Sequence, residues 1–400
     1  MSLANGQSYL AIPGPSVVPE AVLRSMHRSS PNIYEGELVE MVPTIISDLR
    51  YVARTDHNVA VYIANGHGAW EAALANMAGP GDTVLVAATG QFAHSWAEMA
   101  ETLGIKAEIV EFGTRSTIDP TRISAALRAD KAQRIKAVLV THVDTSTSIK
   151  NDIKEARAAI DAADHPALLA VDCIASLCCD VFEMDAWGVD VMVAASQKGL
   201  MVPPGLAFVY FNEKAAEQQY ALERVSSYWN WQQRVSPEGF YQYFCGTAPT
   251  LHLYGLRTAL DMIKAEGIEA IWSRHKVLAQ AIWAAVDCWG SGAGKMRMNV
   301  QNPQHRSHAV TALHLGAPDG KKLRRWVEHE AGLTLGIGLG MSTPDDPNGD
   351  GFFRFGHMGH VNAQMIMGLL GTVEAGLCAL DIPHGSGAVE AAARVMASAS

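Results

Sequence analysis

The stretch VMVAASQKGLMVPPGLAFV (residues 191–209) sets a single lysine, Lys198, into a nearly continuous apolar run. Burying an ammonium group is costly unless the group is paired, neutralised or chemically used. The flanking runs VDVMVAAS (189–196) and LAFVYF (206–211) have the composition of buried strands. Lys198 therefore follows directly on a strand, in a setting that favours an uncharged amine.

The same kind of run recurs upstream of Lys198, and helical patterns separate the runs. Helical segments such as GAWEAALANMA (68–78) and HSWAEMAETLG (94–104) lie between strands. Alternation of this kind predicts βαβ units and a mainly parallel sheet, whose strands are apolar because helices cover both faces. With the two runs around Lys198, the predicted strands are VAVYIAN (59–65), TVLVAAT (83–89), AEIVEFG (107–113), KAVLVTHV (136–143) and ALLAVDC (167–173).

The domain organisation follows from the length and from a change of pattern. A chain of 400 residues exceeds what one hydrophobic core usually serves, so we expect two domains. LHLYGLRTALDMIKAEG (251–267) looks like a long connecting helix, and mixed helices and short strands follow it. We therefore expect a large α/β domain over residues 21–265 and a smaller α+β domain over residues 266–400.

Composition narrows the class of protein. The formal net charge of −10 argues against non-specific binding to nucleic acid, and no apolar run has the length of a membrane span. The six cysteines fit neither a zinc pattern nor a disulfide framework, and the opening residues lack a secretory leader, so we expect reduced thiols and a cytoplasmic location. The segment DDPNGDG (345–351) resembles the start of a calcium loop, but His357 stands where the bidentate glutamate is needed, so no metal is predicted.

Polar and aromatic residues follow five of the predicted strands. In open α/β sheets, ligands bind outside the carboxyl ends of the strands, so these residues should meet at one rim. They are Asn65, Gly66, His67 and Gly68, then Gln91 and Phe92, then Thr141, His142 and Asp144, then Asp172, and finally Ser196, Gln197 and Lys198.

These residue types suit one cofactor chemistry. A lysine among apolar groups has a lowered pKa, and its neutral amine can form a Schiff base with an aldehyde. A buried carboxylate such as Asp172 can keep a pyridine nitrogen protonated, which makes a bound pyridoxal ring an electron sink. The turn at residues 65–68 leads into a helix and can present backbone N–H groups to a phosphate. Phe92 could stack on the ring. Together they favour pyridoxal 5′-phosphate.

Over nearly its whole length, in order, the sequence resembles the class V, fold-type I aminotransferases that use pyridoxal phosphate, of the alanine/serine–glyoxylate type. The resemblance implies a large domain with a mainly parallel seven-stranded sheet flanked by helices, a smaller C-terminal domain, and a homodimer with active sites at the subunit interface. The matching segments are PGPSVVPEAVL (13–23), NGHGAWEAALANMAGPGDTVLV (65–86), THVDTSTSI (141–149), VDCIASL (171–177), SQKGLMVPPGLAFV (196–209), TAPTLHLYGLRTALDMI (247–263) and FRFGHMG (353–359).

The resemblance also implies roles for individual residues. Lys198 and Asp172 would be catalytic, Arg354 would bind the substrate carboxylate, and Gly14 and Ser16 would lie in an N-terminal segment, residues 1–20, at the active-site entrance. The cofactor would be held by Asn65, Gly66, His67, Phe92, Thr145, Asp172, Gln197 and Lys198, and by Thr247 of the neighbouring subunit.

Two departures from the family pattern concern the phosphate. The family usually has Ser or Thr with Gly where this chain has Asn65-Gly66-His67-Gly68, and Phe244 stands where a tyrosine is common. A phenylalanine cannot donate a hydrogen bond, so the phosphate contact that the family makes at that position is not expected from Phe244, which Tyr243 precedes.

The reaction implied is ping-pong transfer of an amino group from serine, alanine or aspartate to glyoxylate or a similar 2-oxo acid. Two alternatives stay open. An aminotransferase with an unusual donor, such as pyridoxamine with pyruvate, would fit the aromatic segment 226–244. A class V lyase or cysteine desulfurase would need a cysteine on a mobile loop, and none lies between Cys288 and Cys378. A regulator that only binds the cofactor is disfavoured because Lys198 and Arg354 are both present. The choice of donor is not determined.

Overall fold

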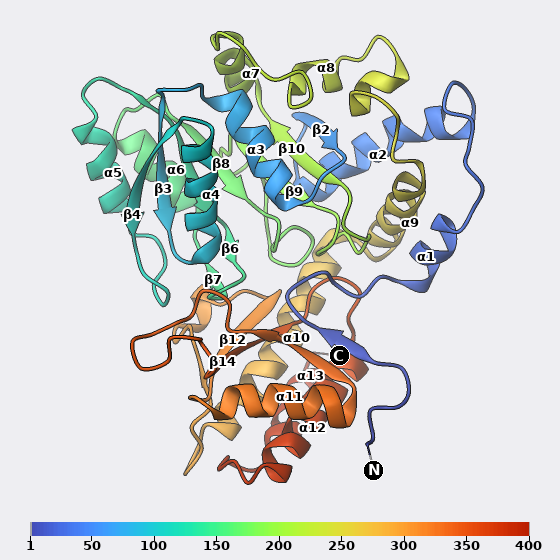
Figure 1. Cartoon of the computed structure of the whole chain (residues 1–400), viewed down its shortest axis with the longest axis vertical. Helices are drawn as coiled ribbons and strands as arrows, with labels where there is room; N and C mark the ends of the chain where they lie inside the picture. The colour runs from blue at the N-terminus through green and yellow to red at the C-terminus, as the bar shows by residue number, and fades with distance from the viewer. Residues whose placement is uncertain (1, 400) are drawn as a thin grey trace.

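A seven-stranded sheet forms the centre of the larger part of the molecule. The computed structural model describes residues 2–399, and Figure 1 shows this sheet in its upper half. Six strands run parallel to one another, whereas β10 is antiparallel to both of its neighbours, which confirms the predicted mainly parallel sheet. In spatial order the strands are β2 (Asn58–Tyr62), β10 (Ala207–Phe211), β9 (Val191–Ala195), β8 (Leu168–Asp172), β5 (Ile135–Thr141), β3 (Thr83–Ala88) and β4 (Lys106–Glu111).

Helices cover both faces of this sheet, which is why its central strands are apolar on both sides. Successive residues of a strand point to opposite faces, so Val138 packs into one core and Leu139 into the other. The first core contains residues of α1 (Glu20–Met26), α2 (Glu37–Ala53), α5 (Pro120–Ala129), α6 (Ile153–Ala162) and α9 (Thr250–Glu266). The second contains residues of α3 (Gly66–Met77), α4 (Gln91–Thr102), α7 (Glu213–Tyr220) and α8 (Trp231–Val235).

A five-stranded sheet and four helices make up the smaller part, which lies below the large sheet in Figure 1. Four of its strands and its helices come from the C-terminal third, as the sequence predicts. The strands in order are β1 (Tyr9–Ala11), β13 (Leu333–Ile337), β14 (Phe352–Gly356), β12 (Val310–His314) and β11 (Arg297–Met298). The helices are α10 (Ile268–Trp289), α11 (Asp319–Ala331), α12 (Ala363–Ala379) and α13 (Ala388–Ala397).

Two features join the parts more closely than the sequence indicates. The N-terminal strand β1 pairs in parallel with β13 and completes the edge of the small sheet. Helix α10 places Ile268 and Ile271 in a core of the large sheet and Ile282 and Val286 in the core of the small one. One helix therefore belongs to both cores. The division at residues 20 and 265 stays a prediction.

The topology brings the predicted site residues to one edge. Asp172 is the last residue of β8 and pairs with Thr141, the last residue of the parallel strand β5. A short hairpin of β6 (Val143–Asp144) and β7 (Ile149–Lys150) continues from β5 at that edge. Among residues 2–399, no helix combines the length and apolar character needed to cross a bilayer.

Candidate active site

A cavity of about 170 Å³ lies at the carboxyl ends of the parallel strands and contains both predicted catalytic residues. Eight of the nine residues predicted to hold the cofactor line it. The ninth, Thr247, lies before α9 and is exposed, outside this cavity of its own chain. The lining consists of Asn65, Gly66, His67, Trp70, Phe92, Val143, Thr145, Asp172, Ile174, Ala175, Gln197 and Lys198.

Asp172 is buried at the end of β8, and two N–H donors hold its carboxylate. The backbone N–H of Ile174 donates to Oδ1 at 2.7 Å, and the indole N–H of Trp70 donates to Oδ2 at 3.1 Å. Burial raises the pKa of Asp172 to about 7, because a desolvated carboxylate is costly, while the two donors act in the opposite direction. The sequence did not identify Trp70 as a site residue. It lies in a predicted helix, and nothing in the pattern of that helix distinguishes Trp70 from the other core residues.

Lys198 is buried in the cavity wall, and the N-terminal segment closes over it. Its ammonium group donates to the carbonyl oxygen of Pro13. Burial lowers the pKa of Lys198 to about 8, and the positive charge of Arg354 acts in the same direction. An amine with this pKa is neutral in a substantial fraction of molecules near pH 8, as the apolar sequence around it predicts.

Gly14 and Ser16, which the family resemblance assigns to the active-site entrance, lie beside Lys198. A Cβ on Gly14 would stand 2.5 Å from Cε of Lys198. The φ angle of Gly14 is +97°, a backbone conformation that residues with a side chain rarely adopt. The Ser16 hydroxyl donates to the carbonyl oxygen of Lys198 at 2.8 Å, and its backbone N–H donates to that of Gln197 at 2.9 Å. The N-terminal segment is therefore fastened to the loop that carries the lysine.

The start of α3 forms another wall of the cavity. Asn65 is the N-cap of this helix, and its side-chain oxygen accepts the backbone N–H groups of His67 at 3.1 Å and Gly68 at 3.3 Å. Gly66 is buried against Ile174, whose Cδ1 lies 2.5 Å from where a Cβ would be. The partial positive charge of a helix N-terminus thus faces the cavity, although the side chain of Asn65 already occupies two of its N–H groups.

Arg354 reaches the site from the small sheet. It lies in the middle of β14 and is buried, which lowers the pKa of its guanidinium to about 10. Its Nη1 donates to the carbonyl oxygen of Thr145 at 2.8 Å, and its Nε donates to that of Ile337 at 2.7 Å. No hydrogen bond from Nη2 to another described residue is formed, so that group remains able to bind a carboxylate.

These features fit pyridoxal phosphate. The cavity combines an amine of lowered pKa, a buried carboxylate, the aromatic ring of Phe92 and a helix N-terminus. Within the described chain, Oε1 of Gln197 is buried without a hydrogen-bond partner, and it belongs to a residue that lines the cavity. A polar ligand in the cavity would satisfy it, as buried polar atoms require.

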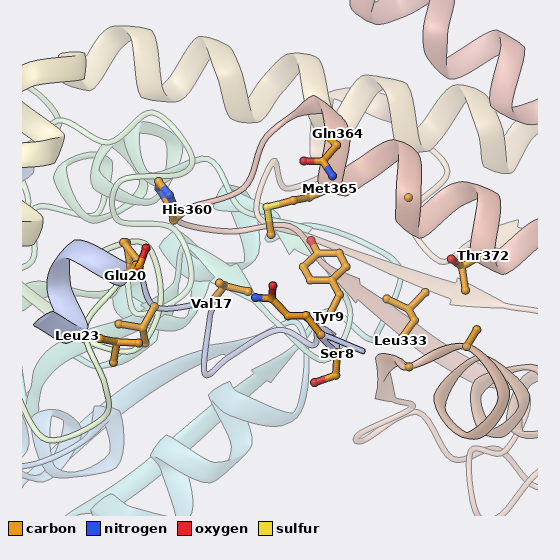
Figure 2. A pocket seen from close by; sticks show the side chains of 16 residues that line it. Ser8, Tyr9, Val17, Glu20, Leu23, Leu333, His360, Gln364, Met365 and Thr372 are labelled. Atoms are coloured by element: carbon orange, nitrogen blue, oxygen red, sulfur yellow. The ribbon is translucent and has the colours of Figure 1, made fainter. Parts of the chain in front are cut away.

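A larger hollow elsewhere does not have this chemistry. Figure 2 shows it between the N-terminal segment and α12, with Tyr9, Val17, Glu20, Met365 and Thr372 around it. Its volume is about 850 Å³, yet its described lining includes neither lysine nor arginine and none of the predicted site residues. Size alone therefore does not identify the site.

The aromatic segment 226–244 packs against the large domain. Arg234 is buried at its centre, with its guanidinium 4.1 Å from the ring centre of Tyr62 and 4.9 Å from that of Tyr228. Trp229 donates its indole N–H to Glu71 of α3 at 3.0 Å. None of the cavity-lining residues comes from this segment. In the described chain it supports β2 and α3.

Comparison with known proteins gives the family. The family model for class V aminotransferases matches residues 9–344, and the chain belongs to that family. The serine–glyoxylate aminotransferase of Methylorubrum extorquens is 36% identical over 397 residues, which cover 96% of this chain and 95% of that protein. The L-aspartate–glyoxylate aminotransferase of Paracoccus denitrificans is 32% identical over 394 residues, covering 97% and 96% of the two chains.

A solved structure agrees with these relatives. The ureidoglycine–glyoxylate aminotransferase of Bacillus subtilis superimposes with a TM-score of 0.87 at 25% identity, covering 99% of this chain and all of that one. The protein is thus an aminotransferase of class V, and its cofactor is pyridoxal 5′-phosphate. The predicted family, fold, enzyme class and cofactor are confirmed.

Proposed function

We propose that this enzyme transfers the amino group of a small amino acid, such as serine, alanine or aspartate, to glyoxylate or a similar 2-oxo acid. The observation that carries the proposal is that Lys198 and Asp172 line one cavity, and that the Arg354 guanidinium donates to the carbonyl oxygen of Thr145, which also lines that cavity. Relatives that cover nearly the whole chain support it, because glyoxylate occurs in the names of both.

In this proposal the cavity residues hold the cofactor. Asp172 would face the ring nitrogen, Phe92 would lie against the ring and Thr145 would bind the ring hydroxyl. Asn65, Gly66, His67 and Gln197, which also line the cavity, would surround the phosphate. When bound, pyridoxal phosphate withdraws electrons from the substrate α-carbon and carries the amino group between the two substrates.

Lys198 is the base and acid of the proposed reaction. Its neutral amine would take a proton from the α-carbon of the donor and would return that proton to the carbon attached to the cofactor ring. A pKa near 8 suits this exchange, because a base works best when its pKa is close to the working pH. The carbonyl oxygen of Pro13 holds the amine at the cavity between these steps.

Arg354 binds the α-carboxylate through its free Nη2 edge, and this role gives a prediction. Arg354→Lys keeps the charge but loses the planar fork, so KM for the amino donor should rise about 30-fold while the cofactor stays bound. Arg306→Lys is the matched control, because Arg306 is also buried and donates to the carbonyls of Val300 and Gln301 at 2.8 Å, away from the cavity. Steady-state kinetics of both variants would measure this; equal KM values would argue that another group holds the carboxylate.

Trp70 should matter through one hydrogen bond. Trp70→Phe keeps a ring in the core but removes the N–H that stabilises the ionised Asp172, so kcat should fall about tenfold. Trp96→Phe is the control: its ring stacks on Trp70 with centres 5.9 Å apart, and its Nε1 has no partner in the described chain. Turnover assays at the same pH would compare kcat of Trp70→Phe with kcat of Trp96→Phe. Equal losses in both variants would show that packing, not the hydrogen bond, is responsible.

We also propose that two chains form a homodimer in the cytoplasm. Thr247 is exposed and lies outside the cavity of its own chain, so it is free to line the cavity of a second copy. Six free cysteines fit a reducing compartment.

A donor and acceptor screen tests the proposed reaction. Purified enzyme loaded with cofactor would be incubated with serine, alanine, aspartate or pyridoxamine, each with glyoxylate or with pyruvate, and the amino acid products would be quantified. We expect glycine from glyoxylate with at least one small amino acid. Formation of alanine from pyridoxamine and pyruvate alone, with no glycine from any amino acid, would replace the proposal by the pyridoxamine alternative.

A further inference from the structure

The helix that carries Phe92 cannot cap its own start. The N-cap of α4 is Gly90, which has no side chain to accept the free N–H groups of the first turn. Residues after β5 supply the acceptors instead. The backbone N–H of Gln91 donates to the hydroxyl of Ser146 at 3.1 Å, and that of Phe92 donates to Oδ2 of Asp144 at 2.9 Å.

Asp144 is fully buried and is held by hydrogen-bond donors. Its Oδ1 accepts the backbone N–H of Ser146 at 2.9 Å and the Ser146 hydroxyl at 2.5 Å. No ion pair to this carboxylate is formed within residues 2–399. Burial raises its pKa, whereas bonds from Ser146, Phe92 and Ala93 lower it. A negative group at the start of a helix is also favoured by the helix dipole.

The same carboxylate fixes the loop that meets Arg354. Thr145 lies between Asp144 and Ser146, and its carbonyl oxygen accepts Nη1 of Arg354 at 2.8 Å. Gly90 lets the helix approach this loop closely: a Cβ there would stand 2.6 Å from both carboxylate oxygens of Asp144. Its φ of 172° is extended backbone that any residue adopts, so the need for glycine is one of space.

We propose that Asp144 is a positioning residue of the active site, which caps α4 from a separate strand and so fixes Phe92, Thr145 and, through Thr145, Arg354. The inference rests on the proposed roles of these three residues. A single buried carboxylate then determines how the ring-facing side chain and the carboxylate-binding side chain stand relative to each other.

The test measures cofactor binding directly. Apo-enzyme would be titrated with pyridoxal phosphate, and the circular dichroism of the bound cofactor, which reports how its ring is held, would be recorded. In Asp144→Asn the amide replaces one acceptor oxygen by a donor, so the dissociation constant should rise about tenfold. The dichroism per bound cofactor should fall, and KM for the amino donor should rise.

A second variant and two controls separate positioning from stability. Gly90→Ala pushes a methyl group against the carboxylate and should reproduce both changes without altering Asp144. Asp119 is the N-cap of α5 and accepts the backbone N–H of Thr121 at 2.9 Å. Asp119→Asn weakens this cap and should lower the stability of the protein without changing cofactor binding. Gly371→Ala, in α12 with nothing within 4 Å of the new Cβ, should leave binding unchanged.

The outcomes are distinct. Weaker binding and reduced dichroism in Gly90→Ala support the inference even if Asp144→Asn does not fold. If every variant that folds binds pyridoxal phosphate with a dissociation constant within about twofold of the wild-type value and shows equal dichroism, the inference is overturned. The proposed function would not be affected by that result. A wild-type protein that neither binds pyridoxal phosphate nor transfers an amino group would overturn the proposed site and this inference with it.

Discussion

Lys198→Ala is expected to abolish amino transfer, with kcat reduced at least about 10³-fold, in a protein that still folds and still binds pyridoxal phosphate. The variant removes the only lysine that lines the described cavity, and with it both the nucleophilic amine and the proposed proton carrier. The remaining lining, with Asp172, Phe92 and the start of α3, stays in place to hold the cofactor. Turnover assays, together with equilibrium dialysis of the cofactor, would measure the two effects separately.

Two further measurements sharpen this test. Lys214→Ala is a suitable control, because the Lys214 amine donates to the carbonyl oxygen of Ala167 at 3.2 Å, outside the cavity, and its loss should not change kcat. Small primary amines such as methylamine should restore part of the activity of Lys198→Ala, since they can enter the space of the missing side chain. Turnover of Lys198→Ala above about a tenth of the wild-type rate would overturn the assignment of the base.

Asp172→Asn is expected to lower kcat about 10²- to 10³-fold with a smaller effect on folding. An amide has the size of the carboxylate but cannot carry the negative charge that, in the proposed role of Asp172, would keep the ring nitrogen of the cofactor protonated. One of the two donors, Ile174 N–H or Trp70 N–H, would also face an NH₂ group in place of an oxygen. The pH dependence of the absorbance of bound cofactor, together with kcat, would report the change.

Asp190→Asn provides the matched control for Asp172→Asn. Asp172 and Asp190 are both 4% exposed, and Asp190 also accepts hydrogen bonds, from Leu169 N–H at 2.7 Å and from Asn212 at 2.8 Å. Its replacement should lower the temperature of unfolding without changing kcat of the folded enzyme. A similar loss of kcat in both variants would mean that buried charge supports the sheet generally and that Asp172 has no special part in the reaction.

Local pattern accounts for what could be predicted of the fold. The strands of the large sheet are short apolar runs, and segments with helical periodicity lie between them. The existence of the strands follows from the runs, and their mostly parallel direction follows from the alternation with helices. The joining of β1 to β13 could not be predicted, because more than 300 residues separate the two strands and β1 has only three residues. The sharing of α10 between two cores depends on where the neighbouring helices pack, which its periodicity does not specify.

The candidate site divides in the same way. Asp172 and Lys198 could be identified because each is a polar residue directly after an apolar strand, and the carboxyl ends of parallel strands share an edge. Trp70 could not be identified as a site residue, and Asp144 could be placed at the rim but not as the cap of α4, because both parts depend on hydrogen bonds to residues distant in the chain. Arg354 was assigned by family resemblance alone, and its contact with Thr145 arises only when the two sheets pack together.

The sequence by itself determined the chemistry: a buried amine and a buried carboxylate at the ends of consecutive strands, with the cofactor that such a pair serves. It could do so because burial and strand direction are properties of short segments. The tertiary structure alone decided which groups hold the amine and the carboxylate in place: the Trp70 indole bonds Asp172 and the backbone carbonyl of Pro13 bonds Lys198. It also decided that Asp144 caps α4. Hydrogen bonds depend on distances of about 3 Å between residues far apart in the chain, and these distances are set only when the whole molecule packs.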